Sequence, residues 1–157
     1  MPNDPTLLAA RENVGESLDE IRKAVAGLTA DQLNARPAGE ESNLLAVIAT
    51  HALASTRSWL ALALGAPLPP RDRPAEFLAV VDDVDAFIAQ VDAQIAAILK
   101  LIDDAEIFDA SRTGIAAWMT RAGADEPVTA AWALQHGLAH LGEHVGHAQL
   151  TRQLIAG

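Results

Sequence analysis

The chain has 157 residues, half of them hydrophobic, so it is long enough to fold as one domain with its own core, and we expect a single domain over residues 1–157. The absence of cysteine excludes disulfides, thiolate metal ligands and a cysteine nucleophile from this chain. The net charge of −10 and the scattered basic residues argue against a nucleic-acid partner and an anionic membrane surface, because both require clustered cations.

The first residues, MPNDPTLLAARENVGES, show no basic stretch followed by a long apolar one, so they do not resemble a secretion signal. The longest fully apolar runs, residues 44–49 and 59–64, are too short to span a bilayer. We therefore expect a cytoplasmic protein. Alanine and leucine dominate the composition and tyrosine is absent, which favours helices over strands.

Apolar residues recur every three or four positions over residues 6–28, which predicts a first helix. Residues 29–32 have the pattern of a helix cap with a short extra turn, and Pro37 and Gly39 then end regular structure. A second helix is predicted over residues 42–64, starting from an N-cap at its first or second position, Ser42 or Asn43.

Glycine and prolines over residues 65–70 end the second helix. A third helix is predicted from Pro74 or Ala75 to Ile102, because apolar residues follow a helical stripe along it. This stripe comprises Phe77, Val80, Val81, Val84, Phe87, Ile88, Val91, Ile95, Ile98, Leu99 and Ile102.

Residues 103–127 give the weakest pattern. Ser111–Gly114 indicates a turn, and Ile115–Arg121 fits either one or two helical turns or a short extended piece. Residues 128–155 contain no proline and predict a last helix roughly 40 Å long. Four long helices predict an all-α protein with an up-down four-helix bundle, although one long crossover connection would give the same pattern.

Four of the five histidines, His136, His140, His144 and His147, lie on the last predicted helix, and His51 lies on the second. Two histidines four residues apart share a helix face and can bind one ion together. His51 is then the natural third ligand, from a facing helix. Three neutral imidazoles suit Zn²⁺, Ni²⁺ or Fe²⁺ and leave a position open for water or substrate. Spacing alone does not decide which pair binds, and a lone histidine on an apolar face is commonly a hydrogen-bonded core residue.

The segments LTADQLNARP, SNLLAVIATHALASTRSWL and HLGEHVGHAQLTRQL follow one another in an order and spacing that resemble the DinB-like superfamily. That superfamily of metalloenzymes includes the mycothiol-dependent maleylpyruvate isomerases, and the resemblance covers nearly the whole chain. It implies a DinB-like helical bundle with a divalent metal bound by His51, His140 and His144. Zinc and nickel are the ions that we expect first. The roles of His136, His147 and Glu143 stay open.

Three alternative functions stand for such a site, and the resemblance implies the first of them. The first is a thiol-dependent transferase or isomerase that uses a diffusible low-molecular-weight thiol, since the chain has no cysteine of its own. The second is a metal-dependent hydrolase, and the third is a non-catalytic stress or interaction protein with a structural metal. We expect a small-molecule substrate for the enzyme functions. A homodimer is also expected, because relatives often pair through bundle helices.

Overall fold

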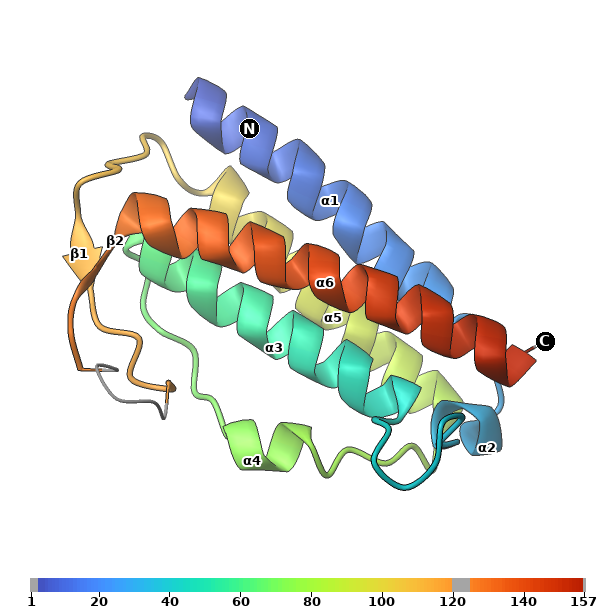
Figure 1. The fold of residues 1–157 in the computed structure, drawn as a ribbon. Coiled ribbons are helices and arrows are strands. Elements are labelled where there is room, and N and C mark those ends of the chain that lie inside the picture. The colour runs from blue at the N-terminus through green and yellow to red at the C-terminus, as the bar shows by residue number, and fades with distance from the viewer. Residues whose placement is uncertain (1–2, 120–124, 157) are drawn as a thin grey trace.

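The computed structural model describes residues 3–119 and 125–156. Within these ranges four long helices form an all-α bundle (Figure 1), which confirms the predicted fold class. They are α1 (Pro5–Val25), α3 (Leu45–Leu64), α5 (Val84–Asp103) and α6 (Ala130–Ala156). The connections carry two one-turn helices and an antiparallel pair of two-residue strands. These are α2 (Ala30–Leu33), α4 (Arg73–Glu76), β1 (Thr113–Gly114) and β2 (Val128–Thr129).

The bundle contains one long crossover, the second of the two connection schemes that the sequence allows. Residues 65–83 return along the length of the bundle and carry α4, so α3 and α5 run in the same direction (Figure 1). Helices α1 and α6 run the opposite way (Figure 1). Helix α6 packs against α1 and α3, and α1 packs against α5 and α6 and touches α3. The most extensive contact between two helices is that of α3 with α6, which places the two histidine-bearing helices face to face.

The early helices start where side chains satisfy their free amides. Asp4 accepts from two amides at the start of α1, and a reciprocal capping box between Thr29 and Gln32 starts α2. Helix α3 begins at Leu45, three residues after the predicted Ser42. The hydroxyl of Ser42 instead donates to the carbonyl of Gly39 at 2.7 Å, so it stabilises the preceding turn.

The prediction of one third helix from Pro74 or Ala75 to Ile102 is wrong at its start. Helix α5 begins at Val84, and Asp83 caps it by accepting from the amide of Ala86. Before it, the Asn34 side chain donates to the carbonyl of Val81 at 2.8 Å and accepts from its amide at 2.9 Å. These bonds replace the helical ones, because they occupy both the amide and the carbonyl of Val81.

The same difference changes the predicted buried stripe. Phe77 is 39% exposed and Val80 is 63% exposed, whereas Val81, Phe87, Val91, Ile98 and Ile102 are buried as predicted. The apolar pattern before Val84 therefore belongs to the crossover and not to a helix.

The last helix starts at Ala130, two residues after the predicted start, because Val128 and Thr129 pair with β1. Residues 115–119 form an irregular connection with a turn, and the predicted positions 120 and 121 lie outside the described residues.

All four long helices contribute to one hydrophobic core. Its fully buried side chains include Leu18 of α1, Ile48 of α3, Ile98 of α5 and Leu141 of α6. Across the described ranges, none of the helices combines the length with the apolar character that a bilayer crossing requires.

Candidate metal centre

Three histidines from two facing helices meet inside the bundle. The ring centroids of His51 and His140 lie 5.4 Å apart, those of His51 and His144 lie 5.0 Å apart, and those of His140 and His144 lie 4.4 Å apart. One ring nitrogen of each lies within 4.8 Å of the other two. A tetrahedral zinc site holds such nitrogens roughly 3.4 Å apart, so small rotations of the imidazoles would close the three on one ion.

The hydrogen bonding of these rings fits a metal site. Nδ1 of His140 and both ring nitrogens of His144 are buried, and no described residue offers them a hydrogen bond. A buried polar atom left unpaired costs about 1–3 kcal/mol, so such atoms are rare without a ligand or water. A divalent ion bound to one nitrogen of each ring would give these histidines the partner that the protein does not provide.

All three histidines are held in the neutral form that binds metal. Burial, followed by the electrostatic effect of the neighbouring histidines, lowers the pKa of His140 and of His144 to about 4. Burial also lowers the pKa of His51, and a hydrogen bond to Glu76 opposes that shift. Because metal ligands must be deprotonated, the site is ready to bind an ion at neutral pH without first releasing protons.

These shifts predict a pH dependence for the metal-free protein. The unfolded chain protonates His140 and His144 near 6.5 and the folded chain near 4, so the unfolded state binds more protons between these values. The free energy of unfolding is therefore not reduced by these histidines above pH 6.5, and it falls as the pH drops toward 4. Urea unfolding of the wild type and of a His140→Leu/His144→Leu variant measures this, and the variant is expected to lose less stability over the same range. Equal losses of stability in the two proteins would contradict the lowered pKa values of His140 and His144.

A buried carboxylate fixes the orientation of His51. Oε2 of Glu76 accepts from Nδ1 of His51 at 2.7 Å, and the Arg71 guanidinium donates to both oxygens of the same carboxylate at 2.6 and 3.0 Å. The side chains of all three are at least 93% buried. A carboxylate can only accept, so the ring proton of His51 lies on Nδ1 and its Nε2 keeps a lone pair for a metal.

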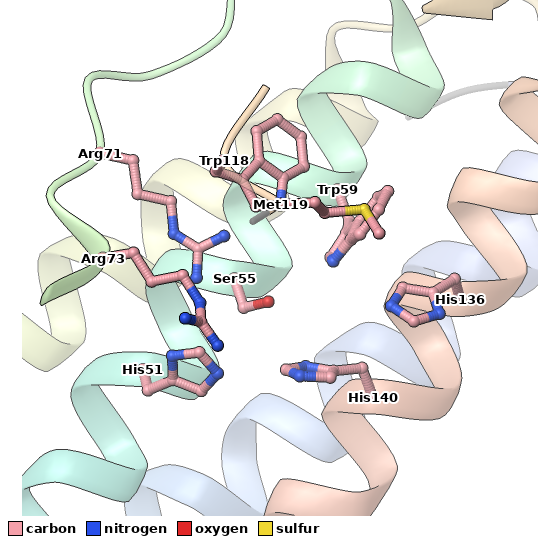
Figure 2. A pocket seen from close by; sticks show the side chains of 9 residues that line it. All are labelled: His51, Ser55, Trp59, Arg71, Arg73, Trp118, Met119, His136 and His140. Atoms are coloured by element: carbon pink, nitrogen blue, oxygen red, sulfur yellow. The ribbon is translucent and has the colours of Figure 1, made fainter. Parts of the chain in front are cut away.

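A cavity of about 250 Å³ opens beside the three histidines (Figure 2). Helix α3, helix α6, the crossover and the β1–β2 connection all contribute to its wall. It is lined by His51, Ser55, Trp59, Arg71, Arg73, Trp118, Met119, His136 and His140. Two of the three converging histidines, His51 and His140, therefore face a space that a small molecule can enter.

Aromatic rings form the far end of this cavity. Trp59 meets Trp118 edge to face at 5.0 Å, and His136 stacks on Trp132 at 4.7 Å. Helix α6 approaches α3 closely here because Gly137 has no side chain: a Cβ at this position would lie 2.9 Å from Cβ of Trp59. Trp59 is thus buried and lines the cavity together with Trp118, whereas Trp132 is 39% exposed and lies behind His136.

The remaining histidines occupy different positions along α6. His136 lines the cavity, but it does not join the three-histidine group. The ring of His147 is exposed, stacks at 6.5 Å on that of His144 and lies outside the same group. Glu143 is exposed as well. The structure therefore brings together His51, His140 and His144 and leaves these three residues out.

The family model of the DinB superfamily matches residues 15–148, which is most of the chain. The chain belongs to the DinB superfamily. A comparison with curated proteins finds no match. Among solved structures, a conserved protein from Enterococcus faecalis is similar over 100% of this chain and 99% of its own, with a TM-score of 0.72 and 16% identity. At that identity the similarity shows the shared fold.

In this member of the DinB superfamily, the sequence alone does not reveal which residues hydrogen-bond to His51 and orient it. The Arg71–Glu76 pair lies in a segment without hydrophobic periodicity, and the sequence separates Glu76 from His51 by 25 residues. A charged Arg-Asp-Arg-Pro-Ala-Glu stretch reads as a solvated loop. Only the return of the crossover along α3 shows that its carboxylate is buried.

Proposed function

We propose that this protein binds one divalent transition metal, zinc or nickel, through His51, His140 and His144. The observation that carries this proposal is the meeting of three neutral imidazoles, two of which, His140 and His144, have buried nitrogens without hydrogen-bond partners among the described residues. Imidazole nitrogens suit these ions, and three protein ligands leave a coordination position free. The adjoining cavity supports a catalytic role over a purely structural one, since a structural site has no need of a substrate pocket.

We further propose that the site serves a thiol-dependent transferase or isomerase. A bound divalent ion would supply a Lewis acid that keeps its full charge beside neutral ligands and strongly favours a thiol in its deprotonated form. The described cavity wall offers a serine hydroxyl but no thiol and no carboxylate, so a strong nucleophile has to enter from solution. Trp59 and Trp118 would exclude water from one side of that nucleophile.

The residues around the cavity also favour a thiol-dependent enzyme over a hydrolase. A hydrolase using bound hydroxide is helped by a nearby carboxylate base. Glu76, the buried carboxylate beside His51, already accepts from Arg71 and from His51. It therefore positions His51, and it is not among the residues that line the cavity.

The experiment is an assay of zinc- or nickel-loaded protein with a reactive electrophile, with and without mycothiol, bacillithiol or glutathione. We expect conjugation that requires both the metal and a thiol, and we expect His144→Ala to reduce it to the uncatalysed rate while keeping the helix content. Turnover without thiol would favour the hydrolase. Binding of metal with no turnover under any condition would favour the non-catalytic protein.

A further inference from the structure

We infer that the cavity beside the three histidines binds a small carboxylate with a planar, apolar body, and that Arg73 is the residue that holds its carboxylate. The inference rests on the proposed function only in placing this ligand next to the metal.

The charge of the lining is the first observation. The whole chain carries −10, yet the nine residues around the cavity include two arginines and no carboxylate. Arg71 is neutralised by Glu76 through two hydrogen bonds. Arg73, in contrast, forms no ion pair with any described residue. One uncompensated positive charge therefore faces the pocket of an acidic protein.

The placement of Arg73 is the second observation. Its guanidinium carbon lies 5.2 Å from the ring centroid of Phe77, and the ring centroid of His51 lies 4.8 Å from the same centroid. Phe77 thus holds Arg73 beside a proposed metal ligand. In Figure 2 the guanidinium of Arg73 points from the crossover toward Ser55 and His51, into the cavity.

The chemistry of the walls defines the ligand. A guanidinium is a planar fork that matches one carboxylate with two parallel hydrogen bonds, and the single charge of Arg73 balances the single charge of a carboxylate but not the double charge of a phosphate monoester. Trp59 and Trp118 supply the flat apolar surface opposite, against which a planar body can stack. At about 250 Å³ the cavity is smaller than the pockets that enclose drug-sized ligands.

The test measures binding of benzoate and of its neutral isostere benzamide by calorimetry or tryptophan fluorescence, with phenyl phosphate as a third ligand. Each is titrated into chelator-treated and into zinc-loaded protein. We expect benzoate to bind about tenfold or more tightly than benzamide in both forms, since charge-assisted hydrogen bonds account for such a factor. We expect it to bind more tightly than phenyl phosphate as well.

Variants of Arg73 identify the group that holds the anion. Arg73→Gln is expected to remove the preference of benzoate over benzamide, and Arg73→Lys to keep part of it because the charge stays while the fork is lost. Lys23→Gln removes the same charge from an exposed position on α1 and serves as the matched control, with unchanged binding expected. Thermal melting checks that each variant is folded.

The outcomes separate this inference from the proposed function. No binding of benzoate, equal binding of benzoate and benzamide, or an Arg73→Gln variant that binds like the wild type overturns the inference even if the metal binds. Benzoate that binds only after zinc is added, with no effect of Arg73, also overturns it, because the metal would then hold the anion. Arg73-dependent benzoate binding in a protein that takes up no metal supports the inference and contradicts the proposed function.

Discussion

Glu76→Ala is expected to lower the free energy of unfolding by roughly 3–5 kcal/mol, the usual cost of leaving one partner of a buried ion pair alone. The stranded partner is Arg71, whose side chain is 6% exposed and which donates two hydrogen bonds to this carboxylate. His51 loses the acceptor of its Nδ1 proton at the same time. Urea unfolding of the metal-free protein measures the loss.

The same variant is expected to bind metal about 10–100-fold more weakly, because loss of a group that orients a ligand typically costs that much. Glu76→Gln keeps an oxygen for His51 but removes the charge, so an intermediate effect is expected. Glu12→Ala is the control, since Glu12 is exposed on α1 and its loss should stay within about 0.5 kcal/mol. If Glu76→Ala costs no more than Glu12→Ala, the buried network does not stabilise the crossover.

His144→Leu is expected to separate stability from metal binding. In the metal-free protein it removes two buried nitrogens without hydrogen-bond partners among the described residues, so its unfolding free energy should equal or exceed that of the wild type. Zinc at about 100 times its dissociation constant should stabilise the wild type by roughly 2.7 kcal/mol and leave the variant unchanged. Thermal and urea unfolding with and without zinc give both values.

The control for that experiment is His147→Ala, which changes an exposed histidine three residues further along α6. The His147→Ala variant should keep the full zinc-dependent increase in the free energy of unfolding. A His144→Leu protein that is much less stable without metal would instead identify His144 as a packing residue of the core.

The long helices are predictable from the sequence because each shows its apolar residues at helical spacing over several turns. The final helix is predicted within two residues at its start, and the short turn after α1 is recognisable from Thr29 and Gln32. The start of α5 is not predictable in this way. Val81 lies in register with the helical stripe, but long-range bonds to Asn34 hold its backbone in another conformation.

The convergence of His51 with His140 and His144 is predicted by combining the one-turn spacing with the family resemblance, and their metal binding stays a prediction. The surroundings of these histidines are not predictable. Glu76 reaches His51 only because the crossover returns along α3, and the cavity forms only where Trp118 folds over Trp59. Such contacts depend on the tertiary path of irregular segments, which leave no periodic pattern in the sequence.

The measurement that tests the central claim most directly is a calorimetric titration of zinc, and then nickel, into chelator-treated protein at neutral pH. We expect one ion per chain, with His51→Ala, His140→Ala and His144→Ala each weakening binding by about 100-fold or more, since even an orienting group contributes 10–100-fold. His147→Ala should bind like the wild type. Wild-type affinity in His144→Ala, or an equal loss in His147→Ala, would contradict a metal centre built from His51, His140 and His144.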